Sequence, residues 1–286
     1  ARAALPGPGR RIPQGGKGTL TMKMRNLVRE KIAQNGYALG AFVASSSAMN
    51  CEILGLNRLD FVIIDCEHAE TNTETIVHMC RASELCGMAP LVRVYDPDDG
   101  PMMSRMLDVG VHGVMAPLIS TPAQAQNLIN FTKYAPRGKR GANGGRGPRW
   151  GLYDDYIHAA NENCLTIAQC ESIEGLENVE KIAAMPGLDA IFIGTGDLSL
   201  EMGIAFKADS SASHTVDDPQ IVAAIDRVLA ACRKNNVIPG IVTASAEDAA
   251  RRIRQGFQLV TCMNDLGFFR SHSAQHIASV RELAAR

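Results

Sequence analysis

Titratable side chains follow three apolar runs of the sequence, at the point where each run ends. They are Asp65 and His68 after the first run, Glu171 after the second and Asp197 after the third. Carboxylate oxygens are the ligands that hard dications such as Mg²⁺ and Mn²⁺ prefer, and such ions often keep open positions for substrate oxygens. The pair of Glu171 and Asp197 therefore predicts a metal site. A 2-oxo acid could chelate that metal through its carboxylate and keto oxygens.

Other polar groups near these positions complete an enolate-forming site. Arg93, in the run PLVRV, could neutralise charge on the keto oxygen. His68, oriented by Asp65, could move a proton directly or through a water. Backbone N–H groups of the turn at 194–197 could hold the substrate carboxylate, because such turns form anion-binding nests. An imine mechanism would need a strand lysine facing the interior, and no lysine lies in a predicted strand, which favours metal catalysis.

Each of these residues also has a structural interpretation. Glu171 and Asp197 could cap the helices that follow them. His68 could be a structural histidine, and Arg93 on an apolar strand could be paired only with a neighbouring carboxylate. Gln169 could be a buried hydrogen-bonding spacer. The shared placement of the carboxylates at strand ends favours the functional interpretation.

Arginines gather in a long connection whose centre reads KYAPRGKRGANGGRGPRWG (133–151). A Gly- and Arg-rich loop of this kind could close over an anion, since long loops in compact domains are often functional. Arg140, Arg146 and Arg149 have two interpretations, a solvated loop, which is the commoner case, or a substrate clamp.

The elements that must position these residues are short apolar runs separated by helical patterns. The runs lie at 39–44, 60–65, 89–94, 112–116, 165–170, 189–194, 237–242 and 258–262. Continuous apolar runs are typical of parallel strands covered on both faces. Helical spacing of apolar residues is clear at 73–86 and 218–235, and a near capping box opens 245–255. The alternation predicts an α/β fold of the (β/α)₈ TIM-barrel type, with an open doubly wound sheet as the alternative.

Composition excludes several classes of function. The chain of 286 residues has a formal net charge of −1 and 5% aromatic residues, which disfavours nucleic-acid and anionic-membrane binding. No apolar run approaches the length of a membrane span, and the cysteines are expected to be buried reduced thiols, which predicts a cytoplasmic protein. We expect residues 1–22 to form a Pro- and Gly-rich N-terminal arm and residues 23–286 to form a single barrel domain.

Several segments together resemble the HpcH/HpaI aldolase family of class II, metal-dependent pyruvate aldolases. They are DFVIIDCEHAE (60–70), PLVRV (90–94), DVGVHGVMAP (108–117), KYAPRGKRG (133–141), LTIAQCES (165–172), GLDAIFIGTGDLS (187–199) and LVTCMNDLGFFR (259–270). The run FIG-x-x-DLS, with a glutamate 26 residues before its aspartate, is the most specific of them.

The resemblance implies a carbon–carbon lyase that uses a divalent metal, with Mg²⁺ favoured over Mn²⁺ or Co²⁺. By the same resemblance, Glu171 and Asp197 are metal ligands, Asp65 and His68 form an acid/base dyad, Arg93 stabilises the enolate and the developing aldol oxygen, Gln169 contacts pyruvate, and the amides of Gly196 and Asp197 hold the carboxylate. It also implies a homohexamer whose subunits exchange their last helix.

The family's substrates leave alternatives open. The first is reversible aldol cleavage of a 4-hydroxy-2-oxo acid to pyruvate and an aldehyde. The second is oxaloacetate decarboxylation with enolate addition to another acceptor, as in fungal relatives such as macrophomate synthase. A CoA-thioester lyase of the malyl or citramalyl type and a barrel that only binds a 2-oxo acid are further alternatives. The sequence departs from the family at Cys66 and Thr195-Gly196, and in the segment after Arg140, which is expected to face the second substrate.

Overall fold

A computed structural model describes residues 22–204, 217–243 and 245–286. Parallel strands form a closed barrel in which each strand pairs with the next and the last pairs with the first. The strands are β1 (Ala38–Val43), β2 (Phe61–Asp65), β3 (Ala89–Arg93), β4 (Gly113–Ala116), β5 (Leu165–Cys170), β6 (Ala190–Ile193), β7 (Ile238–Val242) and β8 (Leu259–Asn264). Closure of the barrel confirms the (β/α)₈ prediction and excludes the open sheet.

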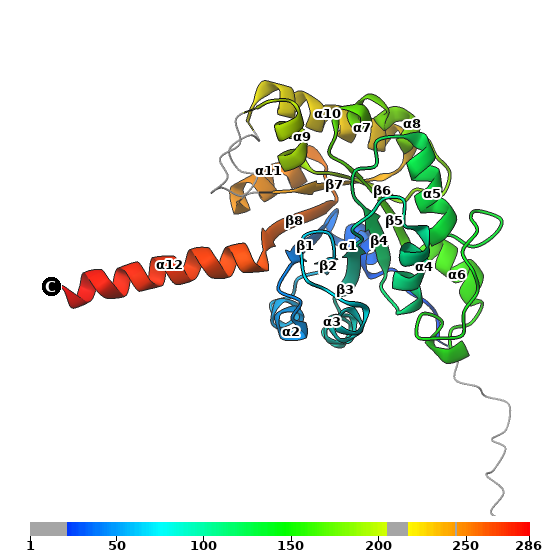
Figure 1. Cartoon of the computed structure of the whole chain (residues 1–286), viewed down its shortest axis with the longest axis horizontal. Helices are drawn as coiled ribbons and strands as arrows, with labels where there is room; N and C mark the ends of the chain where they lie inside the picture. The colour runs from blue at the N-terminus through cyan, green and yellow to red at the C-terminus, as the bar shows by residue number, and fades with distance from the viewer. Residues whose placement is uncertain (1–21, 205–216, 244) are drawn as a thin grey trace, which may run out of the picture.

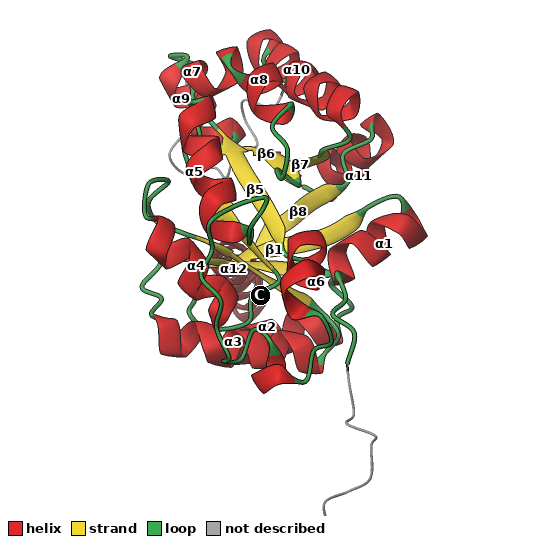
Figure 2. Ribbon diagram, turned by 90° about the vertical axis from the view of Figure 1, so that its right-hand side faces the viewer, coloured by secondary structure: helices red, strands yellow, loops and turns green. Residues whose placement is uncertain are grey.

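Helices surround the barrel (Figure 2), except that the last helix of the chain extends away from it. They are α1 (Leu27–Asn35), α2 (Ala48–Leu56), α3 (Thr73–Leu85), α4 (Gly100–Asp108), α5 (Pro122–Thr132), α6 (Tyr156–Asn163), α7 (Ile173–Glu177), α8 (Val179–Ala183), α9 (Thr195–Glu201), α10 (Pro219–Asn235), α11 (Ala246–Gln255) and α12 (Asp265–Ala284). Their starts follow from local sequence. Asp218 caps α10 just before a proline, and Ser245 caps α11 by accepting from the Asp248 amide. The predicted helices at 73–86, 218–235 and 245–255 are therefore confirmed within one residue at each end.

Side chains that point into the barrel form an inner core. In β2, Phe61 and Ile63 belong to this core, whereas Val62 and Ile64 pack outward. This alternation is the two-residue period of a strand. Val28 of α1 joins the inner core, so α1 closes the end of the barrel where the strands begin. The opposite end, where the strands finish, is the mouth that a barrel enzyme uses.

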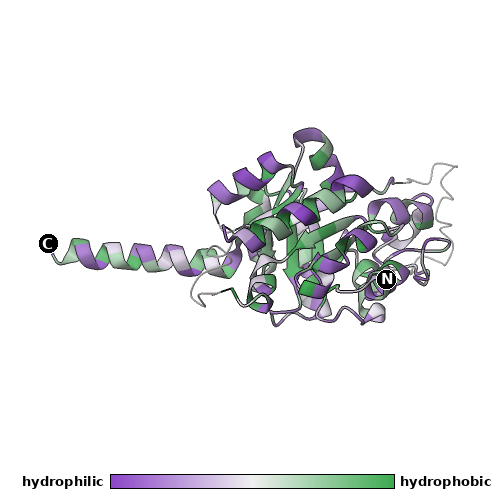
Figure 3. Ribbon diagram, turned by 90° about the horizontal axis from the view of Figure 1, so that it is seen from above, coloured by the Kyte–Doolittle hydropathy of each residue, from purple (hydrophilic) through white to green (hydrophobic). Residues whose placement is uncertain are grey.

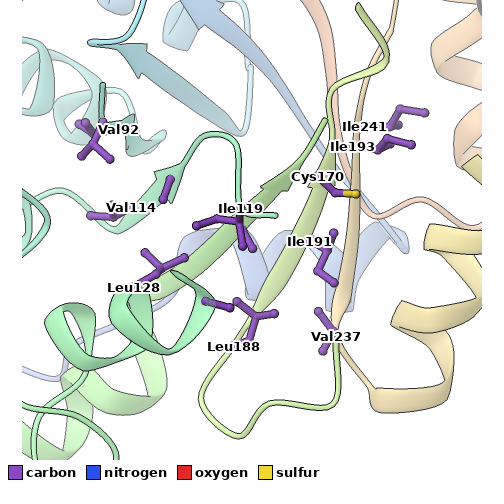
Figure 4. Packing of buried hydrophobic residues seen from close by; sticks show 14 of the residues in the cluster. Val92, Val114, Ile119, Leu128, Cys170, Leu188, Ile191, Ile193, Val237 and Ile241 are labelled. Carbon is purple, nitrogen blue, oxygen red and sulfur yellow. The ribbon is translucent and has the colours of Figure 1, made fainter. Parts of the chain in front are cut away.

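An outer core lies between the strands and the helices. Figure 4 shows Val92 and Val114 from neighbouring strands, with Leu128 of α5 and Ile191 of β6 in the same apolar layer. All four side chains are almost completely buried. Burial of such side chains stabilises the fold by about 1.5–3 kcal/mol each, before the entropy of ordering is subtracted.

Helix α12 differs from the other helices because it leaves the barrel as a projecting rod (Figure 1). Its first residue, Asp265, is buried, and the other residues of the helix are partly or fully exposed. The Asp265 carboxylate accepts hydrogen bonds from the Ala44 amide (2.9 Å), from Ser45 Oγ and from Asn50 Nδ2 (3.2 Å). These bonds fix the base of α12 to β1 and α2. Figure 3 shows hydrophobic residues recurring along the rod, and the apolar side chains of this helix that are exposed include Leu266, Phe269, Ile277 and Val280.

Two further predictions from the sequence concern the N-terminal arm and membrane-spanning segments. The N-terminal arm, predicted at residues 1–22, lies outside the described residues except for Met22, which bridges to Tyr153. Among the helices that the structure describes, none has the length and apolar character that a membrane crossing requires.

Candidate active site

Strand alternation brings the predicted site residues to one place. Asp65 continues the inward-facing series of β2, and Arg93 continues the series of Ala89 and Leu91 in β3. Gln169 and Glu171 continue the inward series of β5 in the same way. All four side chains are buried at the carboxyl ends of their strands. The prediction that these residues meet at the mouth therefore agrees with the geometry.

Arg93 is held by carboxylates on two sides. Its Nε and Nη2 donate to Asp65 Oδ1 and Oδ2 at 3.0 and 2.7 Å, and its Nη1 lies 2.8 Å from Glu67 Oε2. The guanidinium also sits over the Phe42 ring, 4.9 Å from its centroid. Burial alone would lower the pKa of Arg93, but the hydrogen bonds and charge of Asp65 and Glu67 outweigh it, so that pKa is raised. Arg93 is therefore a permanent cation in the mouth.

Glu171 is a buried carboxylate, and the positive charge near it does not offset its burial and the negative charges of its neighbours. The Leu118 amide donates to its Oε1 at 2.9 Å, and Gln169 Nε2 donates to its Oε2. Burial and the negative charges of Glu67 and Asp197 raise the pKa of Glu171 to about 7, although the Leu118 amide and Arg93 oppose the rise. A buried acid with such a pKa is typical of a functional site.

Gly194, at the end of β6, allows Glu171 to occupy this position. A Cβ atom at residue 194 would lie 2.4 Å from Glu171 Oε2 and 3.0 Å from Gln169 Nε2. A Cβ at Gly196, two residues later, would meet nothing within 4 Å. The close approach of Glu171 therefore requires glycine at 194 but not at 196.

Asp197 lies in the first turn of α9, exposed at the mouth, and its charge reaches both Glu67 and Glu171. Helix α9 begins without a side-chain cap. Helix α7, which follows Glu171, is capped by Ser172 instead, whose side chain accepts from the Gly175 amide. Neither Glu171 nor Asp197 is thus a hydrogen-bonded helix cap, although Asp197 lies in the first turn of α9, where a carboxylate also interacts favourably with the helix dipole.

His68 is exposed at the mouth, with 62% of its side chain accessible. Its Nε2 lies 3.7 Å from Glu67 Oε2. Asp65 Oδ1 accepts from the backbone amides of Glu67 (3.1 Å) and His68 (3.4 Å), and we find no Asp65–imidazole hydrogen bond among the described residues. The predicted pairing of Asp65 with the His68 ring therefore stays a prediction.

The arginine-rich segment lies at the other end of the barrel. Arg149 Nη2 binds Glu84 Oε1 at 2.6 Å, Arg146 binds the other oxygen of Glu84, and His112 Nε2 lies 3.2 Å from Oε1. Glu84 is near the end of α3 and His112 directly precedes β4, so this cluster is at the closed end. Arg140 is buried and binds Asp108 Oδ1 at 2.8 Å.

These contacts correct two expectations for Arg140, Arg146 and Arg149. These three side chains are neither free in solvent nor placed as a substrate clamp at the mouth, because they bind carboxylates of the same chain. The segment also does not face a second substrate at the mouth, as the family resemblance implied. Burial would raise the pKa of Glu84, but His112, Arg146 and Arg149 together lower it to about 2.

Sequence reasoning missed three contributors to the mouth. Glu67 lies in the segment DFVIIDCEHAE, next to residues with predicted roles, and no role was predicted for it. Leu118 contributes through its backbone amide, in a left-handed conformation with φ of 49°, and residue type gives no signal for such a contact. Gly194 lies in the FIG-x-x-DLS run, whose glycine was the available signal.

The donor set fits a metal that the protein binds through few ligands. Among residues 22–204, 217–243 and 245–286, no group of three or more His, Cys, Asp or Glu side chains is arranged to hold a metal ion. Glu171 and Asp197 offer two carboxylates, and a hard dication commonly takes its other oxygens from water or substrate. The uncompensated charge around Glu171 favours a bound cation.

Comparisons with known proteins identify the family of the chain. A family model described as HpcH/HpaI aldolase/citrate lyase matches residues 38–271. A 5-keto-4-deoxy-D-glucarate aldolase of Klebsiella pneumoniae is 33% identical over 86% of this chain and 93% of its own length. A hydroxypyruvate/pyruvate aldolase of Chromohalobacter salexigens is 33% identical over 84% and 91%. The crystal structure of macrophomate synthase superposes with a TM-score of 0.76 at 24% identity, over 93% of this chain and 92% of that one, and shows the shared fold.

Proposed function

The chain belongs to the HpcH/HpaI aldolase/citrate lyase family, and from this premise we propose a metal-dependent reaction through the enolate of pyruvate. The chain is an enzyme of the aldolase type, a carbon–carbon lyase. The observation that carries the proposal is the buried Glu171 carboxylate beside Glu67, Asp197 and a single guanidinium. Such a charge imbalance at a barrel mouth is satisfied by a dication.

Glu171 and Asp197 are proposed to hold the metal, with Mg²⁺ favoured because both donors are carboxylates. When bound, a dication would polarise the keto group of a 2-oxo acid and stabilise the enolate. The amides of Gly196 and Asp197, at the uncapped start of α9, would hold the substrate carboxylate. Gln169, whose Oε1 is buried without a hydrogen-bond partner in the described part of the chain, would contact the pyruvate moiety.

Proton transfer is assigned to His68 and charge stabilisation to Arg93. In the cleavage direction, His68 accepts the proton of the 4-hydroxyl group, the C3–C4 bond breaks, and its electron pair enters the enolate while the aldehyde leaves. His68 then returns the proton to C3 to give pyruvate. Arg93 neutralises the oxygen on which negative charge develops, and its own charge is secured by Asp65.

The substrate class follows from the relatives' names and from this chemistry. We propose a 4-hydroxy-2-oxo acid, with 5-keto-4-deoxy-D-glucarate as the first compound to assay, because relatives at 33% identity are named for it. Decarboxylation of oxaloacetate would reach the same enolate, since carbon dioxide leaves from the carbon that otherwise loses the aldehyde. The half-reaction shared by the two activities is therefore the first to test.

Proton exchange of the pyruvate methyl group in D₂O tests that half-reaction. We expect exchange that depends on Mg²⁺ or Mn²⁺ and that stops when a chelator is added. Asp197→Ala should abolish exchange and lower metal affinity by about 100-fold or more. Asp98→Ala, which removes an exposed carboxylate from the loop after β3, should change neither. Absence of exchange with every metal tested would refute the proposal.

Helix α12 supports a further proposal, that the chain assembles with copies of itself, as a hexamer if it follows its family. Leu266, Phe269, Ile277 and Val280 share one face of the helix at 100° per residue, and all are exposed. Helix α2 exposes a second apolar stripe formed by Met49, Ile53 and Leu56. Two unpartnered apolar surfaces on one chain are typical of a protein that buries them against another copy.

Light scattering after size-exclusion chromatography measures this assembly. The wild-type chain should elute with a mass several times that of one chain. Phe269→Glu combined with Val280→Glu should reduce the mass, because two charges would enter an apolar contact. Phe268→Glu, on the other side of the helix, is the matched control and should not. A monomeric wild-type chain would contradict the proposal.

A further inference from the structure

A relay of two hydroxyl groups connects the loops that follow β1 and β2. Ser46 Oγ lies 2.7 Å from Thr71 Oγ1, and Thr71 Oγ1 donates to the backbone carbonyl of Asp65 at 3.0 Å. A hydroxyl group has one proton, so Thr71 uses its own on Asp65 and must accept from Ser46. The relay therefore runs in one direction, from Ser46 through Thr71 to the last residue of β2.

The relay supplies a hydrogen-bond donor where the sheet has none. The β1–β2 ladder ends one pair before Asp65. In the peptide between Asp65 and Cys66, the Cys66 amide donates to the Arg93 carbonyl at 2.9 Å, on the side of β3. The carbonyl of the same planar peptide points the opposite way, toward the side of β1. Thr71 thus takes the place of the missing strand partner, and the last peptide of β2 is held on both sides.

The loop from which the relay starts is itself fixed. The Ala44 amide donates to Asp265 Oδ1 at 2.9 Å, and Ser45 Oγ donates to the other oxygen of the same carboxylate. Ser46, the next residue, has a φ of 52°, in the left-handed region that residues other than glycine rarely adopt. Such a conformation persists only where the surrounding contacts determine it. The bonds of Asp265 on one side and of Thr71 on the other are these contacts, and they bring the Ser46 hydroxyl to the loop after β2.

Resting on the proposed function, we infer that Thr71 is a positioning residue of the reaction: its hydroxyl, oriented by Ser46, fixes the last peptide of β2 and with it the direction of the Asp65 carboxylate. Asp65 binds the Arg93 guanidinium through both of its oxygens. The predicted pairing of Asp65 with His68 depends on the same direction. A small rotation of this peptide would therefore displace the groups that meet the reacting oxygen and the transferred proton.

Thr71→Val tests the inference, because valine keeps the branched shape of threonine and removes its hydroxyl. We expect the rate constant for pyruvate methyl exchange at saturating substrate to fall by about 20-fold, within the range that a misplaced reacting group costs. The KM for pyruvate and the Mg²⁺ affinity should stay within about twofold of wild type, and the thermal midpoint within a few degrees. Thr71→Ser, which keeps the hydroxyl, should restore the rate to within about twofold of wild type. Thr73→Val, at the first residue of α3, is the matched control and should have no effect.

A double-mutant cycle tests the direction of the relay. Ser46→Ala should lower the exchange rate by about fivefold in the wild-type background and no further in the Thr71→Val background, because Ser46 acts through Thr71. An equal loss in both backgrounds, wild-type exchange by Thr71→Val, or a loss that Thr71→Ser does not restore would overturn the inference. Should Thr71→Val fail to fold, Ser46→Ala alone decides, by a fall in rate at unchanged KM or by no fall. Absence of metal-dependent exchange in the wild-type enzyme would instead count against the proposed function, so the two failures are distinguishable.

Discussion

Glu171 at the mouth and Glu84 at the closed end are both shielded acids of one barrel, but their surroundings differ in sign. Glu84 is met by Arg146, Arg149 and His112, and its pKa falls to about 2. Glu171 is met by other carboxylates and by the more distant Arg93, and its pKa rises to about 7. Burial acts in the same direction at both sites, so the difference comes from the neighbouring charges.

The contrast separates a structural acid from a functional one. At the closed end, arginines of the connection between α5 and α6 compensate Glu84 and attach that connection to α3. At the mouth, Asp65, Glu67, Glu171 and Asp197 face one guanidinium, which Asp65 already binds. A cluster that its own chain neutralises is complete, whereas a cluster left negative has capacity for a cation.

Glu171→Gln should give the largest effect on activity. It should also distinguish the functional acid at the mouth from the structural acid Glu84 at the closed end. We expect a loss of about 1,000-fold or more in metal-dependent pyruvate exchange, because a proposed ligand charge is removed. The free energy of unfolding without metal should not fall, since a buried charge with little compensation costs stability. Exchange kinetics and chemical denaturation measure the two quantities. A large drop in stability with exchange retained would mean that Glu171 belongs with Glu84 as a structural acid.

Gly194→Ala should test whether the position of the Glu171 carboxylate governs metal affinity at the mouth. The new Cβ would lie 2.4 Å from Glu171 Oε2 and displace the carboxylate, so we expect metal affinity to fall by about 10- to 100-fold. Gly196→Ala has open space and should bind metal as the wild type does. Titration calorimetry with Mn²⁺ measures both. Equal affinities would show that the position of Glu171 does not govern metal binding.

Glu84→Ala should lower stability and leave activity almost unchanged, which is the opposite of the result expected for Glu171→Gln. Removing it leaves Arg146 and Arg149 without their shared carboxylate, at a cost of about 3 kcal/mol of unfolding free energy. Turnover of the folded fraction should stay within about twofold, because the cluster is at the opposite end from the mouth. Urea denaturation and exchange kinetics at a permissive temperature make the test. Stability equal to that of wild type would remove the structural role from this cluster.

The pH dependence of stability should give the smallest effect. The pKa of Glu84 is depressed from 4.5 to about 2, so its contribution is present above about pH 4.5 and is lost as the pH falls toward 2. We expect wild type to exceed Glu84→Gln by about 2 kcal/mol at pH 6, and the difference to shrink toward pH 2. Denaturation of both proteins across this window measures it. A difference that does not change with pH would contradict the assigned pKa.

The sequence predicts the mouth better than the closed end, for a physical reason. Parallel strands of a barrel end together, so polar residues at the ends of apolar runs, such as Asp65 and Glu171, had to converge. The end of the barrel that the arginine-rich segment reaches depends on helix α5, for which no range was predicted from the sequence. Helix α5 (Pro122–Thr132) returns the chain to the start of the barrel, where Arg146 and Arg149 then bind Glu84.

Contacts through the backbone were beyond sequence reasoning. The Leu118 amide reaches Glu171 only because Leu118 adopts a positive φ, and no pattern of residue types indicates that conformation for leucine.

The charge imbalance at the mouth also has a kinetic consequence. Among the described residues, the carboxylates of Asp65, Glu67, Glu171 and Asp197 surround the Arg93 guanidinium, and this excess of negative charge attracts a dication over a distance and repels an anionic 2-oxo acid. The metal should therefore bind first and the acid second, which makes the encounter a compulsory sequence. Pyruvate should show no measurable affinity for the metal-free enzyme, and its association rate should increase with the fraction of enzyme that is metal-loaded. The order of binding, metal before 2-oxo acid, would thus contribute to substrate selection together with the shape of the mouth.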